Sequence, residues 1–494
     1  MKKILCLLLA LVLLVSGALA EGDTQTQTVD LSSYLIVLHT NDLAGDPQAG
    51  LGLSKVSLVK ARFEQAGAKV LLLDAGNWLG GSEGSWLDQG EGMTALMRDA
   101  GYAAANVGAG EYAYGLARLR ELKLTAGEMR LPGDSVQTEG DVPEKDVVLT
   151  DVAGLKVGLF AVTGQGAAEG CTFSDPLITA QACALALEEQ GCDLIVGLCA
   201  ADDETARQIA AQTDGIDLLL CAGGEAFQGG EWSESGTLLS QAGKGLSPIG
   251  CVAIDSQGNA TAMTLDASYF DEGATDADFD AKVSEALAAQ QAKKAEVIAT
   301  VPAALSGENS DAAQTALGSW AADAVKAQTG ADAVLLSGVS LGAQSPAGEA
   351  TRQTILDAFP GETGLIRTTL TGAQLKALLE QAVEAYPEKS ERFLQVSGLT
   401  FSIDPAQQAG SRVHDVKLNG AALDENAQYT VVCTADAALE GAQNCGVLSW
   451  TLCDALAGGA AQFTGEPMEA RINEAALPTA EPTAESAATD QPNG

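Results

Sequence analysis

Few side chains in this chain have the types that metal chemistry requires. Its 494 residues include only two histidines. Asp42 follows the apolar run Ile36-Val-Leu, a pattern that predicts a buried strand ending in a polar turn. Asp42, Asn77 and Glu225 could together form an oxygen-only site for Ca²⁺ or Mg²⁺, since these ions prefer oxygen ligands. The alternative is that Asp42 caps the turn after its strand.

Other arrangements of reactive residues are weaker. Asp46 and Asp74 are placed on different loops without a supporting His or Arg, so they do not indicate an acid–base pair. The sequence contains neither a Walker-type nor a dinucleotide-binding fingerprint. No Cys-x-x-Cys pair occurs, which argues against a thiolate zinc site. The nine cysteines after residue 20 allow one disulfide within Cys171, Cys183 and Cys192, and another within Cys433, Cys445 and Cys453.

Apolar strand-like runs alternate with helical patterns from about residue 33 to 270. The expected strands are Leu35–Leu38, Val70–Leu73, Lys156–Val162, Asp193–Leu198, Asp217–Cys221 and Ile249–Ile254, and the expected helices include Ser54–Ala66, Met93–Ala100 and Asp203–Gln212. This alternation predicts an α/β domain with a largely buried sheet. Residues 276–297 lack Gly and Pro and predict a connecting helix, followed by a second α/β unit over residues 299–472.

Five segments of the first domain resemble, in order, the metal-binding loops of the secreted 5′-nucleotidases. They are Ile36–Gly45, Asp74–Ser82, Gly101–Gly115, Val196–Ala200 and Gly215–Glu225. The family versions typically contain H-T-N-D-x-H-G, D-A-G-D, G-N-H-E, I-V-L-S-H and G-G-H-S-H. The resemblance implies an N-terminal calcineurin-like metallophosphoesterase sandwich whose two metals would activate a hydroxide nucleophile.

Most ligand positions implied by the resemblance hold other residues in this chain. The substituted positions are Ala44, Asn77, Ala109, Gly110, Ala113, Ala200, Gly223 and Glu225. Asp42 alone is unchanged, and His39 occupies a strand position that is not a ligand in the family. Glu111 keeps a family position with an expected structural role. The flanking turn glycines persist, so the resemblance implies that the chain keeps the family's fold but has lost its metal-dependent catalysis.

The second α/β unit is similar to the family's C-terminal substrate-binding domain. The matching segments are Gln314–Ala324, Leu335–Gln344 and Arg392–Gly398. Phe393 matches one of two aromatic residues that sandwich the base, so it is a candidate substrate-binding residue; the alternative is a packing role. The partner loop Asp436–Asn444 lacks the second aromatic and the ribose-binding Asp, and Gly342 stands where a substrate-binding Arg belongs.

The ends of the chain predict export. Residues 1–20 combine Lys2-Lys3, an apolar run and the ending Ala18-Leu-Ala20, which is typical of a cleaved signal peptide. A polar leader covers residues 21–32, and residues 473–494 form a Pro/Thr/Ala/Glu tail that is expected to be disordered. No second apolar run reaches the ~20 residues that span a bilayer. The protein is therefore expected to be secreted or to lie outside the cell envelope.

The strongly negative net charge of the chain limits the kinds of partner that it can bind. A formal net charge of −39 repels nucleic acid and anionic membranes. The sequence thus predicts an exported 5′-nucleotidase-like pseudoenzyme without a cofactor, which binds an unknown small molecule or protein. One alternative is a divergent metal-dependent phosphoesterase with one weakly bound divalent cation at Asp42, Asn77 and Glu225. Another is a scaffold whose cleft binds nothing.

Overall fold

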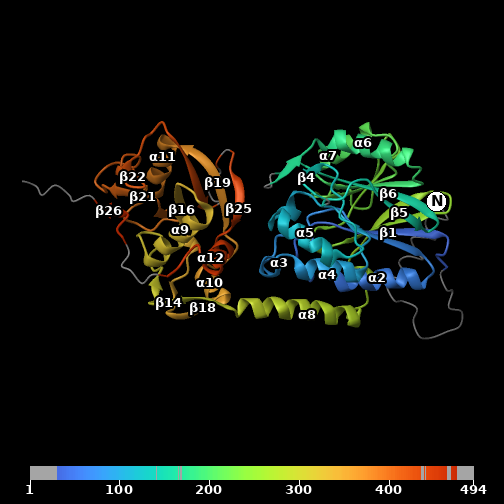
Figure 1. Cartoon of the computed structure of the whole chain (residues 1–494), viewed down its shortest axis with the longest axis horizontal. Coiled ribbons are helices and arrows are strands. Elements are labelled where there is room, and N and C mark those ends of the chain that lie inside the picture. The colour runs from blue at the N-terminus through green and yellow to red at the C-terminus, as the bar shows by residue number, and fades with distance from the viewer. Residues whose placement is uncertain are drawn as a thin grey trace, which may run out of the picture. The chain divides into compact units, whose positions relative to one another are not determined.

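The computed structural model describes residues 30–140, 142–164, 166, 170–434, 439, 441–463 and 469–474. The predicted signal peptide, most of the polar leader and nearly all of the tail lie outside these residues. The chain divides into two compact units, Met1–Gln291 and Ala292–Gly494 (Figure 1).

Unit 1 contains two sheets. The five-stranded sheet has the order β13 (Ala260–Leu265), β12 (Ile249–Asp255), β1 (Tyr34–Thr40), β2 (Lys69–Asp74) and β3 (Ala104–Ala105). The six-stranded sheet has the order β10 (Glu231–Trp232), β11 (Leu238–Gln241), β9 (Leu218–Ala222), β8 (Leu194–Ala200), β6 (Leu155–Thr163) and β5 (Val147–Val152). Strands β1, β2 and β3 are parallel, as are β6, β8, β9 and β11, so each set ends at one edge of its sheet.

The two sheets pack face to face between two layers of helices. Along β1, Leu35 and Val37 contact the core between the sheets, whereas Ile36 and Leu38 face the helices on the outer side. This alternation follows from the two-residue period of a strand. Helices α2 (Leu53–Gln65), α4 (Glu91–Ala100) and α5 (Gly115–Ala126) cover the five-stranded sheet, and α6 (Pro176–Glu189) and α7 (Asp203–Gln212) cover the six-stranded sheet (Figure 1). The predicted α/β sandwich is confirmed.

Shorter elements complete unit 1. They are α3 (Glu83–Asp88), the hairpin-like pair β4 (Val136–Thr138) and β7 (Cys171–Phe173), and the 3₁₀ turns Ala109–Tyr112, Lys244–Leu246 and Ala267–Tyr269.

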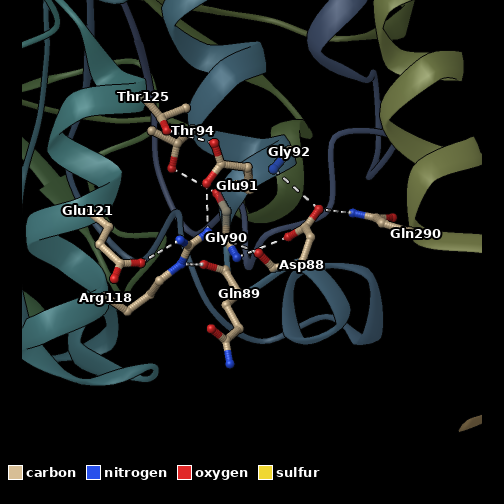
Figure 2. A network of polar contacts seen from close by, with 10 residues as sticks. All are labelled: Asp88, Gln89, Gly90, Glu91, Gly92, Thr94, Arg118, Glu121, Thr125 and Gln290. Atoms are coloured by element: carbon tan, nitrogen blue, oxygen red, sulfur yellow. Dashed lines mark hydrogen bonds and ion pairs between the residues drawn. The ribbon is translucent and has the colours of Figure 1, made fainter. Parts of the chain in front are cut away.

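Helix α8 (Ala277–Lys294) is fastened to unit 1 along most of its length. Phe279 and Val283 are buried in the core beneath α2 and α4. Near its end, Gln290 Nε2 donates to Asp88 Oδ2 over 2.9 Å. Figure 2 shows that Asp88 also accepts from the backbone N–H groups of Gly90 and Gly92, next to the ion pairs of Arg118 with Glu91 and Glu121. The boundary between the units falls directly after this anchor.

Unit 2 also contains two main sheets. One has the order β20 (Leu394–Ser397), β16 (Ala333–Ser337), β24 (Gln428–Thr434), β19 (Gly364–Thr371) and β25 (Gln443–Val447). The other has the order β23 (Ala421–Ala422), β22 (Val413–Leu418), β21 (Leu399–Ile403) and β26 (Ile472–Glu474). Two small pairs join β14 (Val297–Val301) to β18 (Gly348–Thr351) and β15 (Leu305–Ser306) to β17 (Gln344–Ser345). The helices are α9 (Ala316–Thr329), α10 (Arg352–Ala358), α11 (Gly372–Ala382) and α12 (Leu448–Ala457), with a 3₁₀ turn at Gly338–Ser340.

The two disulfides that the sequence allows are not formed, because all nine cysteines after residue 20 are free thiols. Six of these thiols are buried in the two cores, and those of Cys171, Cys192 and Cys445 are partly exposed. Cys183, for example, points from α6 into the core under the six-stranded sheet, and Cys453 is buried in α12. Within the described part of the chain, no helix has both the length and the apolar character that crossing a membrane requires.

Candidate functional site

The loops after β1, β2 and β9 meet at one edge of the sandwich. The Asp42 N–H donates to the Gly76 carbonyl over 2.9 Å, and the Ala44 N–H donates to the Asn77 carbonyl over 3.0 Å. The Gly223 N–H reaches Asp42 Oδ2 over 2.9 Å. The first, second and fifth segments singled out in the sequence therefore converge. The first two follow the parallel neighbours β1 and β2, and the fifth follows β9 of the other sheet.

Three N–H groups occupy the carboxylate of Asp42. Asn77 Nδ2 donates to Oδ1 over 2.7 Å, and Asn41 Nδ2 and the Gly223 N–H donate to Oδ2 over 2.8 and 2.9 Å. Asp42 and Asn77 both adopt left-handed backbone conformations, with φ of 53° and 60°. Asp and Asn tolerate this region better than most residues, which explains how the two turns bring these side chains together.

Glu225 is placed differently from the other two predicted ligands. Its side chain is exposed, and among the hydrogen bonds and ion pairs of the described residues none joins it to Asp42 or Asn77. The structure thus brings Asp42 and Asn77 into contact, and Gly223 contributes its backbone in place of a side chain.

The side chains at this edge of the sandwich do not supply enough free ligand atoms for a pair of divalent ions. Both oxygens of Asp42 accept hydrogen bonds, and the Asn77 amide presents its NH₂ group to Asp42. In the described residues, three or more His, Cys, Asp or Glu side chains converge only at Asp134, Asp146 and Cys183. There both oxygens of Asp134 accept backbone N–H groups, over 2.9 and 2.7 Å. The Asp134 carboxylate therefore ties the backbone at Asp146 to that at Ala161.

The loops pack closely around several small residues. A Cβ built on Gly76 would lie 2.7 Å from the Ala200 Cβ, and one on Gly80 would lie 2.9 Å from the Ala113 Cβ. A Cβ on Gly110 would lie 3.1 Å from Asn77 Oδ1. Of these three glycines, only Gly110 lies at a position where the resemblance implies a larger side chain, and such a side chain would require Asn77 to shift.

Buried polar residues beneath the loops hold them in place. Asn106 Nδ2 donates to the carbonyls of Ala75, Val162 and Leu198 over 2.9 to 3.2 Å, and so ties three strand ends together. Sequence reasoning missed Asn106, although an Asn directly after a short buried strand is a usable signal. Glu111 accepts the Trp78 N–H over 2.8 Å, which supports its expected structural role.

Burial changes the ionisation of these groups. It raises the pKa of Glu111 to about 7, because the charged form loses its hydration. Burial also raises the pKa of Asp74 well above its usual value, although Thr40 Oγ1 donates to it over 2.6 Å. Burial lowers the pKa of His39 to about 3, so this imidazole is neutral and its Nε2 lies 3.0 Å from Ser240 Oγ. These residues are fixed parts of the core.

In unit 2, the Phe393 ring is 2% exposed and stacks on Tyr386, with 6.4 Å between the ring centroids. A ligand could reach the ring only if neighbouring side chains moved. Gly342 donates its N–H to the Ala358 carbonyl over 2.8 Å. Residues 436–438 and 440 of the predicted partner loop lie outside the described residues.

A cavity of about 380 Å³ lies beside this region, at the carboxyl ends of β16 and β24. Its polar lining residues are Ser337, Gln381, Glu391, Arg392 and Thr434, and its apolar ones include Leu335, Leu378, Leu394 and Cys433. A mixed lining of this kind, at the ends of parallel strands, is a common setting for a small-molecule site.

Residues 294–447 match the family described as 5′-nucleotidase, C-terminal domain. Unit 2 therefore carries a 5′-nucleotidase C-terminal domain. The match covers the cavity residues on β16, β20 and β24. A curated relative, the trifunctional nucleotide phosphoesterase protein YfkN of Bacillus subtilis, is 26% identical over 312 residues, which is 57% of this chain. The chain spans only about a fifth, 21%, of that relative's length.

Solved structures show the fold of most of the chain. The NAD nucleotidase of Haemophilus influenzae matches with a TM-score of 0.70 and 15% identity, over 90% of this chain and 99% of its own. A putative 5′-nucleotidase from Staphylococcus aureus matches with a TM-score of 0.55 and 15% identity, over 90% and 100%. The 5′-nucleotidase precursor of Thermus thermophilus has a TM-score of 0.50 and 21% identity, over 90% and 100%. The chain has the two-domain fold of the 5′-nucleotidases, with a metallophosphoesterase-like N-terminal domain.

Proposed function

We propose that this chain is an exported, non-catalytic 5′-nucleotidase-like protein that binds a small molecule through unit 2. One observation carries the proposal. The carboxylate of Asp42, the single ligand position that the resemblance leaves unchanged, is filled by N–H donors from Asn41, Asn77 and Gly223. The Asp42 oxygens therefore accept N–H groups, whereas a hydrolytic site of this fold would need them to bind metal ions.

The neighbouring residues support the same conclusion. Metal-assisted phosphate ester hydrolysis needs bound ions that polarise the ester and activate water. Ala44, Ala200 and Gly223 offer no side-chain donor to such ions. At Gly110, an added Cβ would lie 3.1 Å from Asn77 Oδ1, so a larger side chain there would require Asn77 to shift. Without ligands for these ions, the chain has no group at this site that would activate a water molecule for attack on the ester.

The unit 2 cavity supports binding as the retained activity. Its volume of about 380 Å³ lies within the range of small-molecule pockets. Arg392 and Glu391 offer charges of both signs beside an apolar floor that includes Leu378 and Leu394. This lining suits a compact molecule with an apolar ring and polar substituents.

Hydrolysis is tested by following phosphate release from 5′-AMP and an aryl phosphate, with Mn²⁺, Zn²⁺, Mg²⁺ or Ca²⁺ added in turn. No turnover above the rate without protein is expected. Metal-dependent turnover that disappears in Asp42→Ala would establish the alternative, a divergent phosphoesterase with an oxygen-ligand site.

Binding is tested by the thermal stability of the full chain with adenosine, 5′-AMP and related compounds, because a ligand that binds the native state raises the Tm. At least one compound should raise it for the wild type and not for Arg392→Gln. The control Lys417→Gln changes an exposed cation on β22, away from the cavity, and should respond like the wild type. If every compound leaves the Tm unchanged, unit 2 is a scaffold without a ligand.

A further inference from the structure

The lining of the unit 2 cavity has an apolar part and a polar part. Leu335, Leu394 and Cys433 come from the neighbouring strands β16, β20 and β24, and Leu378 and Ala382 come from helix α11. The polar members of the lining include three exposed side chains, at positions 381, 391 and 392. The cavity therefore combines apolar walls with a polar, solvent-facing side.

Two charges of opposite sign lie on this solvent-facing side. Glu391 and Arg392 immediately precede Phe393 and β20, and both are exposed. Among the described residues, the Glu391 carboxylate forms no hydrogen bond or ion pair, and the Arg392 guanidinium has one partner, Glu384 at 3.5 Å. Both side chains of that pair are more than half exposed, so it contributes little. Glu391 and Arg392 are thus both available to a ligand.

Uncharged polar groups of the lining add donors and acceptors. Thr434 Oγ1 accepts the Ser337 N–H over 3.3 Å, and Ser337 Oγ donates to the Glu391 carbonyl over 3.0 Å. In the part of the chain that the structure describes, the Thr434 hydroxyl donates to no acceptor and the Gln381 amide forms no hydrogen bond. Thr434 can therefore donate a hydrogen bond to a ligand, and Gln381 can both donate and accept.

This lining does not favour a nucleotide. No aromatic side chain lines the cavity, and the Phe393 ring is 2% exposed, so a base finds no ring face to stack on. A phosphate beside Arg392 would also lie close to the carboxylate of Glu391, which repels it. The volume of about 380 Å³ is near the lower end of small-molecule pockets, which suits a compact ligand. A molecule with one positive and one negative group matches both charges.

We propose that the ligand of this cavity is a free α-amino acid with an apolar side chain. Arg392 and the Thr434 hydroxyl bind its carboxylate, and Glu391 binds its ammonium group. The apolar side chain of the ligand packs between Leu378 and Leu394. This inference rests on the proposed function, since both need the cavity to hold a small molecule, and it adds amino acids to the compounds for the thermal-stability test.

L-Phenylalanine is the first probe, and its binding to the full chain is measured by isothermal titration calorimetry. Two analogues keep the ring and lack one charge each: 3-phenylpropionate has no ammonium group, and phenethylamine has no carboxylate. L-Phenylalanine should bind saturably, and each analogue should bind at least tenfold more weakly, because hydrogen bonds to charged groups are the stronger ones. This comparison uses the wild-type chain alone.

Two variants assign each charge to its residue. Glu391→Gln should weaken the binding of L-phenylalanine about tenfold and should not weaken that of 3-phenylpropionate. Arg392→Gln should weaken the binding of L-phenylalanine by a similar factor and should not weaken that of phenethylamine. Glu388→Gln removes an exposed carboxylate that lies outside the lining, and this matched control should bind L-phenylalanine like the wild type.

The results separate this inference from the proposed function. Binding of adenosine without binding of L-phenylalanine would overturn the inference and leave the proposed function standing. If none of the compounds binds saturably, both are overturned. The inference also fails if either analogue binds as tightly as L-phenylalanine, or if the control loses as much affinity as Glu391→Gln.

Discussion

Replacing Asp42 by Asn tests directly whether its carboxylate is a structural hydrogen-bond acceptor. The wild-type side chain accepts three N–H groups, two on Oδ2 and one on Oδ1. An Asn amide can keep the two bonds on one oxygen, but its NH₂ group must then face the NH₂ group of Asn77. Asn tolerates the φ of 53° at this position, so the backbone adds little cost.

The expected loss is one hydrogen bond to a charged group, about 2 kcal/mol. For a unit of this size, that loss lowers the Tm of its transition by about 4–8 °C. Differential scanning calorimetry of the full chain measures this shift. Asp46→Asn is the matched control, since Asp46 lies in the same loop and accepts only the Gln48 N–H over 2.9 Å among its hydrogen bonds in the described residues. Its Tm should change by about 1 °C or less.

The same experiment, repeated with EDTA, separates a structural acceptor from a metal ligand. A structural acceptor gives the same Tm with and without the chelator, in both the wild type and Asp42→Asn. The reasoning is refuted if Asp42→Asn is as stable as the wild type. It is also refuted if EDTA destabilises the wild type to the level of the variant, because the carboxylate would then be holding an ion.

Three other perturbations have expected results. Burial raises the pKa of Glu111 from 4.5 to about 7, so between these pH values the folded state binds a proton that the unfolded state has released. The free energy of unfolding should therefore fall by about 3 kcal/mol as the pH rises from 4.5 to 8. Urea titrations over this range should show the pH dependence in the wild type and a weaker one in Glu111→Gln. Gly250→Ala should lower the Tm steeply or abolish soluble expression, because its Cβ would lie 2.2 Å from the His39 ring, and adding His39→Ala should restore part of the loss. Gln290→Ala should cost about 1 kcal/mol in calorimetry by removing the bond to Asp88; an unchanged Tm would show that α8 is held by its apolar contacts alone.

Much of the fold follows from patterns that are visible in the sequence. The apolar run predicted over Leu35–Leu38 is the buried centre of β1, and the pattern predicted over Asp203–Gln212 coincides with α7. The long run without Gly or Pro became α8. These elements were predictable because local periodicity and tertiary burial agree in them. Short strands such as β3 and β10 were missed, since two residues carry no period.

The candidate site was predictable only in part. The resemblance predicted that Asp42 and Asn77 are neighbours, and in the structure Asn77 Nδ2 lies 2.7 Å from Asp42 Oδ1. It could not show that the Gly223 N–H also binds Asp42, because these two residues are 181 positions apart in the chain. Nor could it show that Asn41 donates to Asp42, because the direction of that neighbouring side chain depends on the geometry of the turn. The two disulfides that the cysteine spacing allows are not formed, for a similar reason. Spacing along the chain does not reveal which way a thiol points.

The central claim is that this 5′-nucleotidase fold carries no hydrolytic metal site. Metal analysis of the purified chain, combined with phosphate release from 5′-AMP in the presence of Mn²⁺, tests it most directly. The account predicts less than stoichiometric metal and no turnover above background, with Asp42→Ala indistinguishable from the wild type in both measurements. Stoichiometric metal together with turnover that Asp42→Ala abolishes would contradict it.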